Sequence, residues 1–253
     1  MKRMFFIMAL ASAVFADIYE VSSIKEMDKY REEGVLFLYD IDNTLVTLDQ
    51  MLGSDQWFVY RFNELIAEMN NTQEALDKAL AEWTSVQYIS KIHEVEKGSS
   101  QMIKSQQESG VMCIGFTTRG LTLSHCALSQ LNSIGIDFTL SAPVKHDLLF
   151  LTSQSIIFRH GVLFTAGTHK GTTLIEFLNQ MNFTPTKVVF INDKHKDLTQ
   201  VEEGCNRLGI PFIGLRYNYL DEEVAAFDPE IAKLQGDKFF NIMSNEQALR
   251  LKK

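Results

Sequence analysis

The sequence predicts a three-layer α/β fold, with a mostly parallel sheet and a helical segment inserted after the first strand. Three runs are apolar without alternation, at residues 35–39, 111–116 and 188–191, which is typical of strands that a parallel sheet buries on both faces. Between the first two runs, residues 48–109 show helical periodicity and no strong strand pattern. Strands that alternate with helical segments favour helices on both faces of one sheet.

The size and the charge of the chain limit its possible functions. Its 253 residues, 45% of them hydrophobic, are enough for one sizeable core with an insertion, which is the simplest domain arrangement. The formal net charge of −8 argues against a broad surface for nucleic acid or anionic lipid, so we expect no nucleic-acid partner. An acidic protein that handles phosphates must supply positive charge locally, through a metal ion, a lysine or a helix N-terminus.

Residues 1–16 have the pattern of a secretory signal peptide. Lys2 and Arg3 precede the apolar run 4–15, and Ala16 offers a small-residue cleavage site. The apolar run is too short to span a membrane comfortably as a permanent helix. The alternative is a helix of the core. We therefore expect an exported protein that has no stable membrane span after cleavage.

The three cysteines indicate neither a disulfide framework nor a zinc site. Their number is odd, and no two are spaced as CxxC. Cys113 lies in an apolar run and Cys205 on a predicted helix, so we expect small buried side chains at both positions. A disulfide between Cys113 and Cys126 is an open alternative.

Helix and turn signals predict the other elements in order. Residues 24–30 are expected to be helical, and Gly34 ends this polar lead-in before the first strand. Two apolar stripes at helical spacing follow, at 57–69 and 76–89, and a third helix at 101–108 leads back to the sheet. Helix packing explains the aromatic side chains of this segment without a role in substrate binding. The later elements are a helix at 123–134, short strands at 148–151 and 156–158, a turn at 159–161 into a strand at 162–165, a helix at 174–181, a strand at 212–215 and a last helix capped by Ser244.

Polar side chains stand where the buried strands end. Asp40 and Asp42 follow the first strand, and Thr117 closes the second. Asp193 and Asp197 follow the third. The carboxyl ends of parallel strands form the edge at which open α/β sheets bind ligands. Each group also has a local alternative, since the first two aspartates can form an Asx turn and the threonine can cap the next helix.

Four short segments, in this order, resemble the motifs of the haloacid dehalogenase superfamily of phosphotransferases. They are Asp40-Ile41-Asp42-Asn43-Thr44, Thr117, Lys170 and Asp193-Lys194-His195-Lys196-Asp197. The resemblance covers roughly residues 34–217. It implies a Rossmann-like core made of 17–47 and 110–253, with 48–109 as a helical cap. More narrowly, the chain is similar to an exported bacterial branch of that superfamily, located in the periplasm or secreted.

The resemblance implies a role for each motif. Asp40 would be the nucleophile that forms an aspartyl-phosphate, and Asp42 would be the acid that serves the leaving group and the base that serves the water. Thr117 would bond a phosphoryl oxygen, and Lys170 would hold the charges of the nucleophile and the phosphate together. Lys145 is the alternative lysine, but Lys170 directly precedes a helix. Further contacts to the substrate are expected from Asn43, Thr118 and Arg119.

The same motifs predict a Mg²⁺ site. Carboxylates as close as these would repel one another without a cation. The resemblance implies that Mg²⁺ is held by the side chain of Asp40, the backbone carbonyl of Asp42 and the side chain of Asp193. Asp197 would orient these ligands from behind.

Together these observations predict an exported, Mg²⁺-dependent phosphomonoester hydrolase that acts on a small phosphorylated substrate. One alternative is a secreted binding or surface protein that keeps the fold with little turnover. Another is phosphotransfer to an acceptor other than water. The pair Asp40 and Asp42 favours an enzyme, because a binding protein does not need both.

Overall fold

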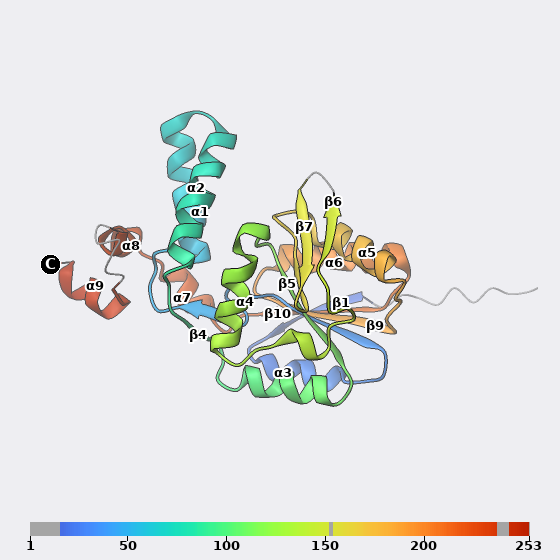
Figure 1. The fold of residues 1–253 in the computed structure, drawn as a ribbon. Coiled ribbons are helices and arrows are strands. Elements are labelled where there is room, and N and C mark those ends of the chain that lie inside the picture. The colour runs from blue at the N-terminus through green and yellow to red at the C-terminus, as the bar shows by residue number, and fades with distance from the viewer. Residues whose placement is uncertain (1–15, 152–153, 237–242, 253) are drawn as a thin grey trace, which may run out of the picture.

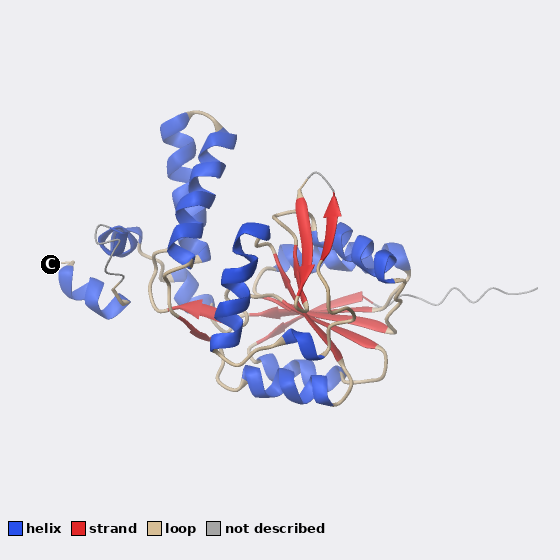
Figure 2. Cartoon of the chain, in the orientation of Figure 1, coloured by secondary structure: helices blue, strands red, loops and turns tan. Residues whose placement is uncertain are grey.

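One large sheet forms the centre of the protein (Figures 1 and 2). The computed structural model describes residues 16–151, 154–236 and 243–252. Within these residues, eight strands form the sheet in the order β1-β10-β9-β2-β5-β8-β7-β6. The first six strands in this order, β1-β10-β9-β2-β5-β8, run parallel to one another. The strand β7 is antiparallel to both β8 and β6. The predicted α/β fold with a mostly parallel sheet is therefore confirmed.

The predicted first strand, β2, lies in the middle of the sheet. Its residues Val35, Phe37 and Tyr39 face one hydrophobic cluster. Leu36 and Leu38 face the other cluster. This burial on both faces explains why the run shows no polar alternation. The strands of the sheet are β1 (Ala16–Val21), β2 (Val35–Tyr39), β5 (Met112–Thr117), β6 (Leu148–Leu151), β7 (Ser155–Arg159), β8 (Val162–Phe164), β9 (Lys187–Asn192) and β10 (Phe212–Tyr217), and a separate ladder joins β3 (Val46–Leu48) to β4 (Ile92–Glu94).

Helices cover both faces of the sheet (Figure 1). One face carries the 3-10 helix η1 (Ile24–Tyr30), α3 (Ser99–Glu108) and α4 (Ser124–Ser133). The other face carries α5 (Lys170–Met181) and α6 (His195–Leu208). Their apolar side chains fill the two clusters that the sheet separates, so the core has three layers. Two short 3-10 turns lie on either side of α4, namely η2 (Leu121–Leu123) and η3 (Phe138–Leu140).

A helical hairpin projects beyond the sheet (Figure 1). Its two helices, α1 (Asp55–Met69) and α2 (Thr72–Gln87), pack along each other around a small apolar cluster. Asn70 ends α1 in the left-handed conformation, and the side chain of Asn71 caps α2. None of the described helices is long and apolar enough to cross a membrane. The helices α7 (Asp221–Ala225), α8 (Pro229–Gly236) and α9 (Asn245–Leu251) lie toward the base of the hairpin.

Three of the strands were not expected from the sequence. β1 was not expected, because its side chains form no apolar run: it is an edge strand, and side chains such as Tyr19 are exposed. β3 and β4 contain three residues each, too few for a periodic signal. The third expected helix, α3, packs on a face of the sheet. The bounds of the predicted cap, 48–109, stay a prediction, and residues 1–15 of the predicted signal peptide lie outside the described residues.

Other expected elements are present. The helix at 24–30 forms as a 3-10 helix. The strands β7 and β8 are joined by His160 and Gly161, which both have positive φ (48° and 78°), as a two-residue hairpin of type I′ requires. All three cysteines are free and buried, so Cys113 and Cys126 form no disulfide.

Candidate active site

A tight loop after β2 presents two aspartates at the carboxyl edge of the sheet. Asp40 extends the ladder, because its amide donates to the carbonyl of Ile191 on β9 at 3.1 Å. The chain then turns around Ile41, whose carbonyl oxygen accepts hydrogen bonds from the amides of residues 44–46. Asn43 takes the left-handed conformation (φ 57°), which Asn adopts more readily than most residues. The loop is therefore compact, and it stands at the end of the strand between β5 and β9.

Lys170, in the first turn of α5, lies next to Asp40. Its Nζ is 2.7 Å from Oδ1 of Asp40 and 2.9 Å from Oδ2 of Asp197 on α6. The lysine is fully buried, and its Nζ lies over the rings of Phe116 and Phe190, at 5.5 and 5.0 Å from their centroids. One buried ammonium group thus serves two carboxylates.

Two glycines place this lysine beside Asp197. A Cβ at Gly171 would lie 1.9 Å from the carbonyl oxygen of Gln200, and a Cβ at Gly204 would lie 2.7 Å from the carbonyl oxygen of Gly171. The backbones of α5 and α6 are therefore in direct contact, which only glycine permits at these positions. The amide of Lys170 also donates to Oε1 of Gln200 at 2.8 Å. This helix contact brings two of the predicted motifs together.

Burial and charge shift the pKa values of this pair. Burial raises the pKa of the Asp40 carboxyl to about 6, although Lys170 acts in the opposite direction. Burial alone would lower the pKa of Lys170, but Asp40 and Asp197 outweigh it and raise that pKa above its ordinary value. Lys170 is therefore a cation near neutral pH, and Asp40 is ionised above about pH 6.

Asp42 is paired with a different cation, Arg119, which follows β5. Nε of Arg119 donates to Oδ2 of Asp42 at 2.9 Å, and Nη2 donates to Oδ1 at 2.6 Å, so the guanidinium holds both carboxylate oxygens. Arg119 also donates to Oε1 of Gln130 on α4 (2.7 Å) and to Oε1 of Gln87 on α2 (3.2 Å). Arg119 is only 2% exposed, so Asp42 compensates its charge inside the protein.

This network was not predicted from the sequence. Arg119 was expected to bind the substrate, and that role stays a prediction. Four of the five N–H groups of its guanidinium already have protein acceptors, so one N–H group remains for a substrate. Burial alone would raise the pKa of Asp42, but the charge and the hydrogen bonds of Arg119 hold it below its ordinary value. Asp42 is therefore a carboxylate in this arrangement. Its position directly after a buried strand was the only sequence signal for Arg119.

Asp193 follows β9 and faces the loop of Asp40. Its amide donates to Oγ1 of Thr44 at 3.2 Å, and its Oδ2 accepts a hydrogen bond from Nδ2 of Asn43 at 3.4 Å. Its Oδ1 is buried and has no hydrogen-bond partner among the described residues. Burial, and next the charge of Asp40, raise the pKa of Asp193 to about 7. Buried polar atoms without a partner are uncommon, and this one suits a ligand for a cation.

The charges of the cluster also fit a divalent cation. Its charged groups are five carboxylates and three cations, namely Asp40, Asp42, Asp55, Asp193 and Asp197 with Lys170, Lys194 and Arg119. Two negative charges therefore stay unbalanced when all groups are ionised. In the described part of the chain, no three His, Cys, Asp or Glu side chains form a group that could hold a metal ion. The predicted set needs only two such side chains, Asp40 and Asp193, because its third ligand is a backbone carbonyl.

The two threonines after β5 differ in exposure. Thr117 is buried, and its Oγ1 accepts a hydrogen bond from the amide of Arg119 at 3.2 Å. Thr118 is exposed. The adjacent carbonyl of Thr117 accepts from the amide of Thr165 on the neighbouring chain segment at 2.9 Å, which fixes the end of the strand. The hydroxyl proton of Thr117 therefore remains for another acceptor at the sheet edge.

The lysines near the motifs have different partners. Lys145, the alternative to Lys170, is exposed and donates to the carbonyl of Thr139. Lys194 was not predicted as a site residue, but its Nζ lies 2.8 Å from Oδ2 of Asp55, the first residue of α1. This pair connects the helical hairpin to the loop after β9. The structure thus brings Lys170, and not Lys145, to the carboxylate cluster.

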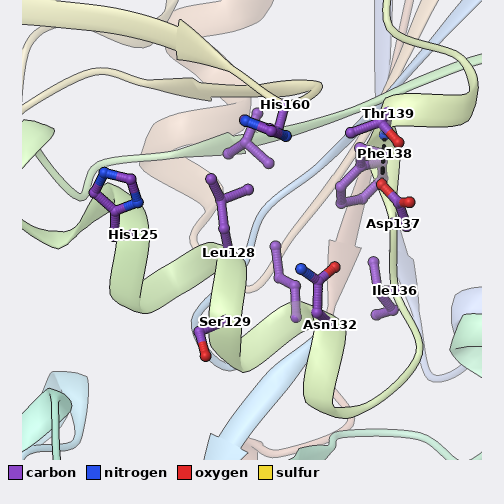
Figure 3. A pocket seen from close by; sticks show the side chains of 11 residues that line it. His125, Leu128, Ser129, Asn132, Ile136, Asp137, Phe138, Thr139 and His160 are labelled. Atoms are coloured by element: carbon purple, nitrogen blue, oxygen red, sulfur yellow. Dashed lines mark hydrogen bonds between the residues drawn. The ribbon is translucent and has the colours of Figure 1, made fainter.

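Two cavities lie beside α4. One has a volume of about 540 Å³ and is lined by α4, η3 and the turn before β8 (Figure 3). His125 and His160 line it, whereas Asp137 uses its carboxylate to cap η3. The other cavity, of about 650 Å³, is bordered by Gln87 and Gln130. None of the predicted site residues lines either cavity.

The fold and this edge define an α/β protein with a buried cluster of paired carboxylates. The chain belongs to the family described as "Protein of unknown function (DUF2608)", whose model matches residues 16–249. A protein of Chlamydia trachomatis serovar D, named "Putative outer membrane protein", is 26% identical over 259 residues, which cover 99% of this chain and 97% of that protein. A protein of the same name from Chlamydia muridarum is 27% identical over 239 residues, or 93% of this chain and 90% of that protein.

Solved structures with a similar chain path include hydrolases. A haloacid dehalogenase-like family hydrolase from Streptococcus pneumoniae has a TM-score of 0.45 and 15% identity, covering 76% of this chain and 98% of that chain. A haloacid dehalogenase superfamily hydrolase from Geobacter sulfurreducens has a TM-score of 0.41 and 13% identity, covering 81% and 99%.

Proposed function

We propose that the protein is a Mg²⁺-dependent phosphomonoester hydrolase in which Asp40 becomes phosphorylated during turnover. The observation that carries the proposal is the contact of 2.7 Å between Asp40 and the buried ammonium of Lys170. Close to it lies Oδ1 of Asp193, which has no hydrogen-bond partner among the described residues. A carboxylate nucleophile, a fixed cation and oxygen ligands for a metal are the groups that phosphoryl transfer to an aspartate requires.

The first half-reaction uses Asp40, Lys170 and Thr117. Asp40 attacks the phosphorus atom as a carboxylate, a form that its pKa of about 6 provides near neutral pH. Lys170 offsets negative charge on the nucleophile and on the transferred group. Thr117 donates its hydroxyl proton to a phosphoryl oxygen, because its Oγ1 already accepts the amide of Arg119. Asn43, Thr118 and Arg119 are further candidates for contacts to a small phosphorylated substrate.

The second half-reaction uses Asp42 as a base. Asp42 is a carboxylate in this structure, which is the form that takes a proton from the attacking water. In the first half-reaction the same group first takes up the acidic proton of the substrate's monoanionic phosphate and then donates it to the leaving oxygen. That step requires Asp42 to release one of its two hydrogen bonds from Arg119.

Mg²⁺ would be held by the side chains of Asp40 and Asp193 and by the backbone carbonyl of Asp42. When bound, the ion supplies positive charge that offsets the carboxylates and the phosphoryl oxygens. Asp197 would orient this arrangement through Lys170, whose Nζ it contacts at 2.9 Å.

A panel of phosphate esters tests the proposed function. Released phosphate is measured with and without Mg²⁺ for the wild type, for Asp40→Asn and for the control Asp137→Asn, which lies outside the cluster. We expect Mg²⁺-dependent release that Asp40→Asn lowers by about 10³-fold or more and that the control keeps. Release from no ester by the wild type, or equal release by Asp40→Asn, would contradict the proposal.

We also propose that the protein is exported from a bacterial cell. The pattern of residues 1–16 supports export, as do the names of the chlamydial relatives. Mass spectrometry of the protein purified from a bacterial host tests this proposal. We expect the mature chain to begin at Asp17 in the exported fraction, and a retained Met1 would contradict it.

A further inference from the structure

Buried hydrogen bonds connect Asp42 to the helical hairpin. Arg119 holds both oxygens of Asp42 and donates to Oε1 of Gln87, the last residue of α2. Gln130 on α4 accepts from Nη1 of Arg119 and donates its Nε2 to both the carbonyl and Oε1 of Gln87, at 3.2 Å each. Arg119, Gln87 and Gln130 are 2, 1 and 7% exposed. The connection therefore runs through the interior of the protein.

The same residues hold the base of the hairpin. Nε1 of Trp83 and Nε2 of Gln87, one turn apart on α2, both donate to the carbonyl of Gly53, at 2.8 and 2.7 Å. Gly53 lies just before α1 and has a φ of 81°, and a Cβ there would lie 2.4 Å from Cγ1 of Val86. The ring of Trp83 also faces the guanidinium of Arg119 at 5.6 Å. The start and the end of the hairpin are thus tied to each other next to Arg119.

We propose that Arg119 is a positioning residue for Asp42, and that Gln87 makes this positioning depend on how the α1–α2 hairpin is docked. The proposal rests on the function proposed above, in which Asp42 serves the leaving group and the water. A planar guanidinium fixes the orientation of a carboxylate on both oxygens, which an ammonium group cannot do. Gln87 in turn keeps the guanidinium in place, so its loss loosens Asp42 without removing a charge.

A misplaced Asp42 has an effect that depends on the leaving group. The p-nitrophenolate ion leaves readily without a proton, whereas phenolate leaves less readily and gains more from an acid. Variants that loosen Asp42 therefore slow the hydrolysis of phenyl phosphate more than that of p-nitrophenyl phosphate. A general loss of folded protein slows both reactions equally.

The experiment compares kcat and KM for these two esters, in Mg²⁺, for the wild type, Arg119→Lys and Gln87→Met. We expect the ratio of kcat/KM for p-nitrophenyl phosphate to kcat/KM for phenyl phosphate, which reports the step that releases the leaving group, to rise about tenfold in Arg119→Lys and about threefold in Gln87→Met. Both residues act through Asp42, so their effects should not be independent. The fold-loss of kcat/KM for phenyl phosphate in the double variant should be smaller than the product of the fold-losses in the two single variants.

Matched controls come from the hairpin itself. Gln73, at the exposed start of α2, bonds Asp77, and Arg61 pairs with Glu82 across the hairpin. Gln73→Met and Arg61→Lys should leave the kcat/KM ratio unchanged. Thermal denaturation identifies variants that do not fold. If Arg119→Lys does not fold, the ratio is still measured in Gln87→Met.

The outcomes separate the two proposals. An active wild type whose kcat/KM ratio is the same in Arg119→Lys and Gln87→Met would overturn the positioning role, as would an equal change in Gln73→Met. A wild type that hydrolyses neither ester in Mg²⁺ contradicts the proposed function, and the positioning role falls with it.

Discussion

Asp40 and Asp42 are two residues apart, yet the protein compensates their charges in different ways. Asp40 shares the single ammonium group of Lys170 with Asp197, and burial raises its pKa to about 6. Asp42 has the guanidinium of Arg119 on both of its oxygens, and its pKa lies below the ordinary value. Around Asp40, which we call the Asp40 side of the loop, negative charge therefore exceeds positive charge. Around Asp42, which we call the Asp42 side, the guanidinium of Arg119 already balances the carboxylate.

The difference indicates a division of roles between the two sides. A metal ion and a phosphoryl group would be held on the Asp40 side. On this side, Oδ1 of Asp193 has no hydrogen-bond partner among the described residues. The Asp42 side is complete within the protein and continues into the helical hairpin. An ammonium group is a point charge that can serve several anions, whereas a planar guanidinium suits a carboxylate whose orientation matters.

Removal of Lys170 should have the largest effect on stability. Lys170→Met leaves Asp40 and Asp197 buried without a cation, so we expect the free energy of unfolding to fall by about 3–5 kcal/mol at neutral pH. Urea denaturation measures this change. The control Lys187→Met, at a half-exposed pair with Glu32, should cost about 1 kcal/mol or less. Equal losses in the two variants would contradict the buried pairing.

Replacement of each aspartate by asparagine should separate the two sides. Asp42→Asn leaves Arg119 buried without a counter-charge and should destabilise the protein by about 3 kcal/mol. Asp40→Asn removes a carboxylate whose ionised form the fold disfavours, so above about pH 6 it should leave stability unchanged or raise it. Thermal denaturation of both variants checks the order, and a reversed order would refute the comparison.

The pH dependence of stability should also have opposite signs on the two sides. In the absence of metal, the pKa values of Asp40 and Asp193 lie at about 6 and about 7, above the ordinary 3.8. Their contribution to stability is therefore fully present below about pH 4 and is lost as the pH rises through about 6 to 7. Asp42 has a lowered pKa, so its contribution is present above its ordinary pKa and is lost as the pH falls through the folded-state value.

Mg²⁺ should restore the stability that is lost at high pH on the Asp40 side, because Asp40 and Asp193 must be ionised to bind the ion. We expect the rise in Tm on addition of Mg²⁺ to be larger at about pH 8 than at about pH 5. At a concentration near 100 times Kd, the gain in the free energy of unfolding should reach about 2.7 kcal/mol. Asp193→Asn is the control that should remove most of this rise. A rise that is independent of pH would contradict the metal site.

The smallest effect is expected at the pair that joins the hairpin to the loop after β9. Lys194 and Asp55 are partly exposed, with 42 and 22% of their side-chain surfaces accessible. Lys194→Met should therefore change the free energy of unfolding by about 1 kcal/mol or less. Urea denaturation checks this, and a loss as large as that of Lys170→Met would show a much stronger link between hairpin and core.

The central strands and their terminal residues could be predicted from the sequence. The apolar run of β2 carries no alternation because the sheet is covered on both faces, and Asp40 follows it directly. β1 could not be predicted, because an edge strand shows no such run. Motif order suggested that Lys170 lies near Asp40, but the contact depends on Gly171 and its approach to α6, which has no pattern in the sequence.

The network on the Asp42 side could not be predicted either. Gln87 and Gln130 lie on helices whose apolar stripes explain their folding, and nothing in their spacing links them to Arg119. Long-range hydrogen bonds between polar side chains are set by how the helices dock, which local periodicity does not report. Side-chain pairings that cross elements are therefore what the structure adds to the sequence.

Detection of phosphate on Asp40 tests the central claim most directly. The protein is mixed with p-nitrophenyl phosphate and Mg²⁺, quenched in acid, reduced with borohydride and analysed by peptide mass spectrometry. Reduction converts an aspartyl-phosphate to homoserine, so we expect homoserine at position 40 in the wild type and none at Asp42 or Asp193. Turnover of the ester with unmodified Asp40 in the quenched wild type, or undiminished turnover in Asp40→Asn, would contradict the account.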